Sequence, residues 1–257
     1  MSRSLPEVDD WFIPLADPAR AGAHVYAFPQ AGGGVTTFAA LAGRLAPEVC
    51  LWALNLPGRQ ARFLQPPRTD LDPLLSDLAA DLAVRTPGTL LGYCSGALLA
   101  FLLARRLRDC GRPPPTALVA VSYPAPDRAA PPRGLHTLGA DEFWREIMSY
   151  RGVPAKVSGQ PDFRQIFEPA LRADYALLAG YEYTGAAPLD APVAVIHGRA
   201  DPVLGGPDVG GWRAHTRAGF QILTVPGDHW LLDGDPDAVA AAVRAIAGPV
   251  AAAREPR

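Results

Sequence analysis

Six short apolar runs recur along the chain, and they constrain the fold more than any other feature. Each run is nearly uninterrupted and is bounded by turn residues, which is typical of strands buried on both faces. The runs are His24–Phe28, Val49–Asn55, Thr89–Tyr93, Ala117–Ser122, Val193–His197 and Phe220–Val225. Helical patterns separate most of them. Alternating strands and helices predict a mostly parallel sheet covered by helices on both faces, which is the α/β class.

Helical spacing fills the gaps between these runs. Residues 71–82 carry leucines on one face of a 3.6-residue period, and residues 38–45, 97–107 and 235–246 show comparable patterns. Residues 135–183 hold helical patterns rich in aromatics with no strand between them, so we predict a helical lid insertion over one end of the sheet. Residues 1–20 are polar and read as a lead-in arm. The length suits a single domain spanning residues 1–257.

The composition excludes several classes of function. The net charge is −2 and no basic stripe appears, so we expect no nucleic-acid partner. No apolar stretch reaches the roughly 18 residues of a membrane span, and residues 1–10 lack the features of a signal peptide. We therefore expect a cytoplasmic protein without a membrane partner. Three cysteines without paired spacing predict no disulfide framework. We also expect a monomer, with no metal and no nucleotide cofactor, because Gly32–Gly34 lacks the remainder of a phosphate-binding loop.

The segment Gly92-Tyr-Cys-Ser-Gly96 lies between the third apolar run and a helical pattern. It has the form of a nucleophile elbow, in which two glycines permit a tight turn that exposes the middle side chain at the carboxyl end of the sheet. The N-terminus of the next helix stabilises a thiolate and a tetrahedral oxyanion. Cys94 is therefore the predicted nucleophile. Ser95 lies one place from the apex and is the weaker candidate, while Cys50 and Cys110 are predicted to be packing residues.

Two backbone N–H groups are candidates for an oxyanion hole. The Ser95 N–H follows the nucleophile, which is the usual position of one donor. The segment Gln30-Ala-Gly-Gly-Gly34 follows the first apolar run, and its glycines allow N–H groups to face a ligand oxygen. We predict the Ala31 N–H as the second donor, with Gln30 nearby. A simple strand-to-helix turn is the alternative interpretation of this segment.

A carboxylate and a histidine follow the last two apolar runs. Asp201 lies in Gly198–Pro202, and His229 follows the final run. The order nucleophile, acid, histidine is that of α/β enzymes with a Ser-His-Asp triad, so we predict Asp201 as the acid and His229 as the base. Asp201 could instead form an Asx turn, and Asp228 is the rival acid. The remaining histidines are predicted to lie in strands, in the lid or on a surface helix: His24, His197, His136 and His215.

Taken together, these segments resemble the type II thioesterases of polyketide and nonribosomal-peptide biosynthesis. The resemblance covers nearly the whole chain and rests on Phe28-Pro29 with Ala31–Gly34, Leu56–Arg59, the elbow, Pro169–Asp174, Gly198–Pro202 and Gly227–His229. It implies an α/β-hydrolase fold and a triad that cleaves acyl thioesters. The acyl group is then carried on the phosphopantetheine of an acyl carrier or peptidyl carrier protein, and the lid shapes the acyl chamber. No other cofactor is implied.

Departures from the family pattern in two segments bear on the outcome of the reaction. The family usually has His-Ser-Met in the elbow where this chain has Tyr93-Cys94-Ser95, and it often has His where this chain has Gln30. A cysteine acyl-enzyme is itself a thioester and retains its acyl-transfer potential. Hydrolysis is the expected outcome, and transfer to an amine, an alcohol or a second carrier thiol, including cyclisation, is the alternative. A non-catalytic carrier-binding module would need a broken triad, and an esterase or lipase would lack the Leu56–Arg59 segment.

Several further residues are candidates for substrate and partner contacts. Gln30, Tyr93 and Trp230 flank the predicted oxyanion turn, nucleophile and base, so we expect them to contact substrate. A carrier protein is expected to present an acidic face. The arginines that we expect to meet this face are Arg59 and the lid residues Arg145, Arg151 and Arg164.

Overall fold

The computed structural model describes residues 9–149, 152–153 and 161–247. Within them, seven strands form one sheet in the order β1-β3-β2-β4-β5-β6-β7. Every neighbouring pair is parallel except β1 with β3. The strands are β1 (Phe12–Pro14), β2 (Ala23–Phe28), β3 (Val49–Leu54), β4 (Thr89–Tyr93), β5 (Leu118–Val121), β6 (Val193–Gly198) and β7 (Phe220–Val225). The predicted α/β class with a mostly parallel sheet is confirmed.

The edge strand β1 was not predicted, because residues 1–20 read as a polar lead-in arm. Phe12 pairs with Leu54 of β3 in the only antiparallel register of the described sheet. Its ring is fully buried and makes edge-to-face contacts with Tyr26 at 5.2 Å and Phe28 at 5.7 Å between ring centres. Three residues are too few to show the two-residue period of a strand. A single aromatic residue, Phe12, was therefore the one hint of β1 in the sequence.

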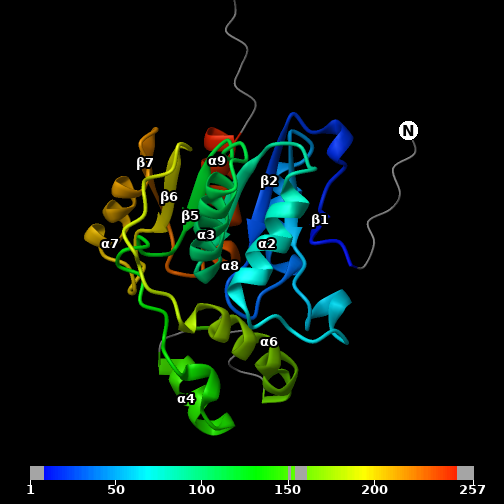
Figure 1. Cartoon of the computed structure of the whole chain (residues 1–257), viewed down its shortest axis with the longest axis vertical. Coiled ribbons are helices and arrows are strands. Elements are labelled where there is room, and N and C mark those ends of the chain that lie inside the picture. Colours follow the sequence, from blue (N-terminus) through cyan, green and yellow to red (C-terminus); the bar gives the residue numbers. More distant parts are fainter. Residues whose placement is uncertain (1–8, 150–151, 154–160, 248–257) are drawn as a thin grey trace, which may run out of the picture.

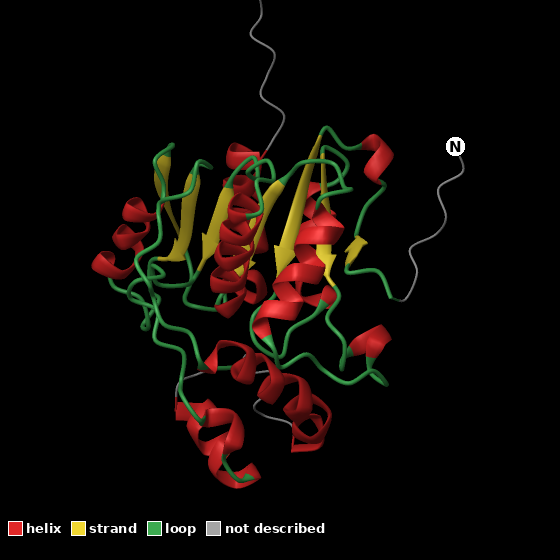
Figure 2. Ribbon diagram, viewed as in Figure 1, coloured by secondary structure: helices red, strands yellow, loops and turns green. Residues whose placement is uncertain are grey.

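Helices cover both faces of the sheet (Figure 1, Figure 2). Helices α2 (Leu71–Leu82) and α3 (Ser95–Asp109) pack on one face, whereas α1 (Ala39–Leu45) and α9 (Pro236–Ala247) pack on the other. The coverage of both faces explains why the strand sequences are apolar without alternation.

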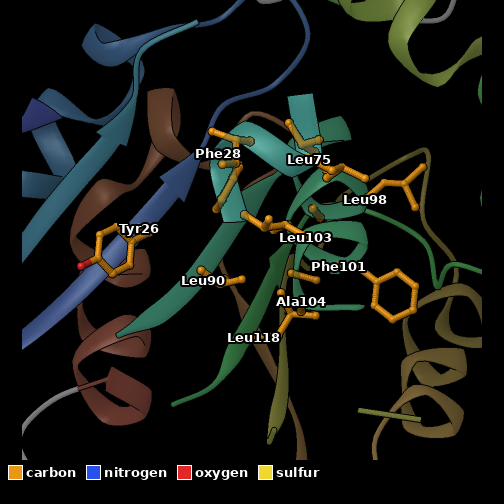
Figure 3. Packing of buried hydrophobic residues seen from close by; sticks show 14 of the residues in the cluster. Tyr26, Phe28, Leu75, Leu90, Leu98, Phe101, Leu103, Ala104 and Leu118 are labelled. Carbon is orange, nitrogen blue, oxygen red and sulfur yellow. The ribbon is translucent and has the colours of Figure 1, made fainter. Parts of the chain in front are cut away.

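Successive side chains of a strand enter different cores. On β4, Leu90 lies in the core beneath α2 and α3, whereas Leu91 lies in the core beneath α1 and α9. Figure 3 shows the first of these cores, where Leu98 and Leu103 of α3 pack over Leu90 and Leu118. Burying one such leucine contributes roughly 1.5–3 kcal/mol to folding, so the junction of β4 and α3 is firmly held.

The lid lies beyond the carboxyl ends of the strands (Figure 1). As predicted, the described part of residues 135–183 holds helices and no strand: η4 (Leu135–Thr137), α4 (Ala140–Ser149) and α6 (Pro161–Ala179). Phe143, Trp144 and Ile147 of α4 form a small core of their own with Leu171 of α6. The lid is thereby a packed unit placed above the edge where the predicted site residues end their strands.

Short elements complete the chain between these layers. They are η1 (Pro18–Arg20), η2 (Val35–Phe38), η3 (Gln60–Arg62), α7 (Gly206–Gly210), η5 (Gly211–His215) and α8 (Leu231–Gly234). Among the described helices, none combines the length and the apolar character that crossing a bilayer demands. A single domain over residues 1–257 stays a prediction.

Candidate active site

Cys94 lies at the apex of a strained turn between β4 and α3. Its backbone has φ +51° and ψ −130°, a conformation that non-glycine residues rarely adopt. A Cβ on Gly92 would come within 2.2 Å of the Ala97 Cα, and one on Gly96 within 2.2 Å of the Phe28 carbonyl oxygen. Both glycines are therefore required by close backbone approach. The turn has the geometry of a nucleophile elbow and leaves the Cys94 side chain partly exposed.

A hydrogen-bonded chain of three side chains begins at Cys94. The Cys94 Sγ lies 3.4 Å from the His229 Nε2, and the His229 Nδ1 lies 3.0 Å from the Asp201 Oδ2. The side chain of Asp201 is fully buried, and its Oδ1 accepts a second hydrogen bond of 2.8 Å from the Val203 N–H. The loops after β4, β6 and β7 thus bring together three residues that lie far apart in the sequence.

Hydrogen bonding among these three side chains shifts the pKa values of His229 and Asp201. Burial alone would lower the pKa of His229, because it penalises the charged imidazolium. The hydrogen bonds of the ring to Asp201 and to Cys94 outweigh burial and raise the pKa of His229 to about 10. Burial acts to raise the pKa of Asp201, but the hydrogen bonds from His229 and from backbone N–H groups lower it below its usual range. The surroundings of the ring therefore favour the charged imidazolium of His229 beside the Asp201 carboxylate.

The rival residues lie elsewhere. Asp228 is exposed, and its Oδ1 accepts the Trp230 N–H at 2.9 Å. Ser95 is the first residue of α3 rather than the apex of the turn. His215 was predicted on a surface helix, but it is buried on η5, where its Nε2 lies 2.7 Å from the Asp127 Oδ1. Its ring contacts are with Phe101, Trp212 and Tyr183, which indicates a structural His–Asp pair.

The remaining cysteines differ in burial. Cys50 is buried in β3, as a packing residue should be, whereas Cys110 is exposed at the C-terminal end of α3, so its predicted packing role is wrong.

The two predicted oxyanion donors lie on facing segments. Gln30–Gly33 forms a turn closed by a 2.8 Å hydrogen bond from the Gly33 N–H to the Gln30 carbonyl, with Gly32 at φ +72°. Ser95 begins α3, so its N–H has no acceptor within the helix. Ala31 and Ser95 line one small cavity together with Leu177 and Leu178 of α6. Their roles as donors stay predictions.

A larger cavity adjoins the same turn on the side of the lid. It has a volume of about 360 Å³ and is mostly apolar. Its walls come from the turn, from the η2 and η3 region and from α6: Gln30–Gly34, Thr36, Thr37, Arg59, Gln60, Phe63, Val153, Ile166, Phe167 and Ala170. Cys94 does not line this cavity. Ala31 of the turn Gln30–Gly33, which we call the oxyanion turn, lines both this cavity and the small cavity that Ser95 lines.

One of the three predicted substrate contacts is contradicted, and a second stays a prediction. Tyr93 is 1% exposed and lies in the core beneath α1 and α9, so the prediction that it contacts substrate is wrong. Strand alternation directs its ring into that core, where its hydroxyl donates to the His229 carbonyl at 3.3 Å. Trp230 packs edge to face on His229, with 5.2 Å between ring centres. Both rings contact His229 or its backbone. Of the three predicted substrate contacts, Gln30 is the one that lines the larger cavity.

One of the four arginines predicted to meet a carrier protein differs from the prediction. Arg59 is buried and forms a bidentate ion pair with Asp174 of α6, with N–O distances of 2.7 Å, so it is no surface contact for a carrier. Arg145 is exposed, and the Arg164 guanidinium lies 5.4 Å from the ring centre of Trp144. Arg151 lies outside the described residues.

Sequence reasoning missed two residues near the nucleophile. Asp174 was part of a recognised motif, but nothing in the local pattern indicated its partner. Tyr123 follows β5, the strand beside β4, and its pKa is raised first by burial and then by the negative charge of a Cys94 thiolate. A tyrosine in a proline-rich segment carries no sequence signal for such a position. Among the described residues, no cluster of three or more His, Cys, Asp or Glu is arranged to hold a metal ion.

Comparisons with known proteins give a consistent result. A family model described as Thioesterase domain matches residues 23–247. The gramicidin S biosynthesis protein GrsT of Aneurinibacillus migulanus is 28% identical over 230 residues, which cover 89% of this chain and 90% of that protein.

Solved structures agree with the family model. The type II thioesterase BorB from the borrelidin biosynthetic cluster superposes with a TM-score of 0.81 at 30% identity, covering 95% of this chain and 99% of that one. The RedJ thioesterase from the prodiginine pathway of Streptomyces coelicolor superposes with a TM-score of 0.79 at 32% identity, covering 89% and 87%.

Proposed function

Because the chain belongs to the thioesterase family, as its motifs predicted, we propose that it hydrolyses acyl thioesters through a covalent intermediate on Cys94. The observation that carries this proposal is the continuous chain from Cys94 through His229 to the buried Asp201, at the carboxyl edge of the sheet beneath the lid. The negative charge of Asp201 and the positive charge of His229 stabilise each other.

The first half of the reaction loads the enzyme. His229 Nε2 already holds the proton, so the Cys94 sulfur attacks the acyl carbonyl carbon as a thiolate. The carbonyl electron pair moves to oxygen, and the N–H groups of Ala31 and Ser95 hold the resulting oxyanion. When the tetrahedral intermediate collapses, the substrate's C–S bond breaks and the leaving thiolate takes the proton from His229. Asp201 holds the Nδ1–H of His229 and keeps the ring in the orientation that both transfers need.

The second half releases the acid. A water molecule donates a proton to His229 Nε2 as its oxygen attacks the acyl-Cys94 carbonyl. The same two N–H groups hold the second oxyanion. Collapse then breaks the bond between carbonyl carbon and Sγ, the Cys94 thiolate leaves beside His229, which keeps the proton, and the free acid departs.

We further propose that the substrate arrives on the phosphopantetheine of a carrier protein in polyketide or nonribosomal-peptide biosynthesis. The support is the kinship with proteins named for such pathways, BorB for borrelidin and GrsT for gramicidin S among them. The mostly apolar 360 Å³ cavity beside the oxyanion turn suits an acyl chain. A long flexible arm suits a nucleophile that lies beneath a lid.

The proposal is tested by measuring free acid released from one acyl group presented on a carrier protein and on free pantetheine. We expect Cys94→Ala to lose at least about a hundredfold in kcat with either substrate, since catalysis through a nucleophile is removed. Cys110→Ala is the matched control, because Cys110 is an exposed free cysteine outside the site, and it should retain full activity. Undiminished hydrolysis by Cys94→Ala would refute the nucleophile, and equal kcat/KM for both substrates would refute carrier docking.

A second candidate function is acyl transfer, and the observation that favours it is the cysteine itself. The acyl-Cys94 bond is a thioester, so its acyl group can still pass to an amine, an alcohol or another thiol. Cys94→Ser changes one atom and converts the intermediate into an oxoester of lower transfer potential.

The product ratio decides between the two candidates. If the enzyme is a transferase, wild type should give acylated acceptor, and Cys94→Ser should lose transfer more than it loses loading. Free acid as the sole product at high acceptor concentration, from both proteins, would exclude transfer.

A further inference from the structure

The carboxylate of Asp174 joins three segments that are distant in sequence. It lies on lid helix α6, is buried, and accepts two hydrogen bonds of 2.7 Å from the guanidinium of Arg59. Its Oδ2 also accepts the backbone N–H of Gly32 at 2.8 Å. The same guanidinium donates to the Gly33 carbonyl at 2.8 Å. Both members of the ion pair therefore hold this turn, Asp174 at the Ala31–Gly32 peptide and Arg59 at the Gly33–Gly34 peptide.

The position of these bonds within the turn determines its shape. Gln30 and Gly33 close the turn, and Gly32 at its third position has φ +72°, which is the signature of a type II turn. Type I and type II turns differ by a flip of the central peptide, here the one that carries the Gly32 N–H. Asp174 accepts that N–H, so it favours the type II form. The neighbouring peptide carries the Ala31 N–H, so the hydrogen bonds that tether this turn to Asp174 and Arg59 also fix the place of that N–H.

Packing joins the same turn to the lid. A Cβ built on Gly32 would come within 3.1 Å of Leu171 Cδ1 and within 3.7 Å of the Phe167 ring, both on α6. The turn therefore packs closely against α6 at Gly32. The hydrogen bonds and the packing therefore act on the turn in the same direction.

We propose that Asp174, paired with Arg59, is a positioning residue that sets the Ala31 N–H in the oxyanion hole and so makes that hole depend on the docked lid helix. The inference rests on the proposed function, because it assigns a role within the same site. It concerns the stabilisation of the oxyanion alone and leaves the nucleophile and base unaltered.

Two reagents separate oxyanion stabilisation from nucleophile reactivity. A trifluoromethyl ketone bearing an acyl-like chain adds to Cys94 and forms a tetrahedral oxyanion, so its affinity reports on the hole. Iodoacetamide alkylates the sulfur by direct displacement without any oxyanion, so its rate reports on Cys94 and His229. Wild type must react with both reagents at Cys94. Failure of wild type to react with either at Cys94 would refute the proposed function itself, which is distinguishable from failure of the positioning role.

We expect Asp174→Asn to bind the ketone about ten- to a hundredfold more weakly, because losing one oxyanion donor costs up to about a thousandfold and a misdirected donor costs less. The rate of alkylation should stay within about twofold of wild type. Glu168→Gln is the matched control, because it breaks an ion pair with Arg172 on the same helix without touching the turn. Unchanged ketone affinity in Asp174→Asn would overturn the proposal, as would an equal loss in Glu168→Gln.

A double variant keeps the test decisive if the single variant is unstable. Removing one member of a buried ion pair leaves the other charge unpaired, whereas replacing both by apolar residues of similar size is often neutral. Arg59→Met with Asp174→Leu should therefore fold, while the Gly32 N–H still loses its acceptor. We expect the same selective loss of ketone affinity in this double variant, and unchanged affinity would overturn the proposal.

Discussion

The charge on His229 depends on its two neighbours, and this makes the residue a direct probe of the site. Asp201 lies on the Nδ1 side of the ring and Cys94 on the Nε2 side, at 3.0 Å and 3.4 Å. Both partners favour the charged ring against the cost of burial. The ring therefore holds its proton through neutral pH and loses it only in alkaline solution.

We expect the His229 ring to titrate with a pKa of about 10 in the wild type, and with lower values in Cys94→Ala and Asp201→Asn. Each change removes a group that stabilises the imidazolium. The measurement is an NMR pH titration of the ring Cε1–H signal, assigned by its loss in His229→Gln. A wild-type pKa at or below the ordinary value of 6.5, or one that neither substitution lowers, would contradict the arrangement.

At the residue scale, residues whose role follows from their order along the chain could be predicted from the sequence. Residues whose role depends on the direction of a side chain, or on a partner far away in the sequence, could not. Cys94, Asp201 and His229 could be selected because each follows a strand in the order of the hydrolase class. Tyr93 could not be assigned correctly, because the buried face of a doubly covered strand is not marked in the sequence. Arg59 could not either, since Asp174 lies 115 positions away.

The elbow between β4 and α3 is the element on which the site depends. Its two glycines are needed for space, since added carbon atoms would meet backbone atoms that cannot move independently. Helix propensity alone would favour alanine at Gly96, the second residue of α3, so a loss of stability there must come from the close approach of Phe28.

Gly96→Ala should lower the free energy of unfolding by at least about 2 kcal/mol, in the range found for overpacked sites. Gly43→Ala is the control, because no heavy atom lies within 4 Å of the corresponding Cβ position in α1. That change should be neutral or stabilise the protein by up to about 1 kcal/mol. Urea denaturation measures both. Equal effects of the two substitutions would show that the close approach at Gly96 has no energetic consequence.

At the element scale, the strands formed by long apolar runs were predicted correctly. Short elements, and elements whose burial depends on distant residues, were not. All six predicted strands are present, and for β2 to β6 burial on both faces leaves a nearly continuous apolar run, whereas the edge strand β7 is largely exposed. The strand β1 has only three residues, and η5 buries His215 through contacts with Phe101 and Trp212 that no local pattern indicates.

For the whole molecule, the parallel sheet explains why residues 94, 201 and 229 meet. Parallel strands end at one edge, and β4, β5, β6 and β7 are neighbours in the sheet, so the loops after them converge. The lid covers that edge, and Asp174 connects it to the turn that holds Ala31. Cys94, His229 and Asp201 thus share one covered edge with the turn that carries Ala31.

The most direct test of this account is time-resolved intact-protein mass spectrometry of wild type mixed with an acyl-loaded carrier. We predict an adduct of the acyl mass that forms before free acid appears, decays at the rate of turnover and maps to the peptide containing Cys94. In His229→Ala, we expect both formation and decay to slow. Continued release of free acid with no adduct at any time, or an adduct confined to Cys110, would contradict the covalent mechanism.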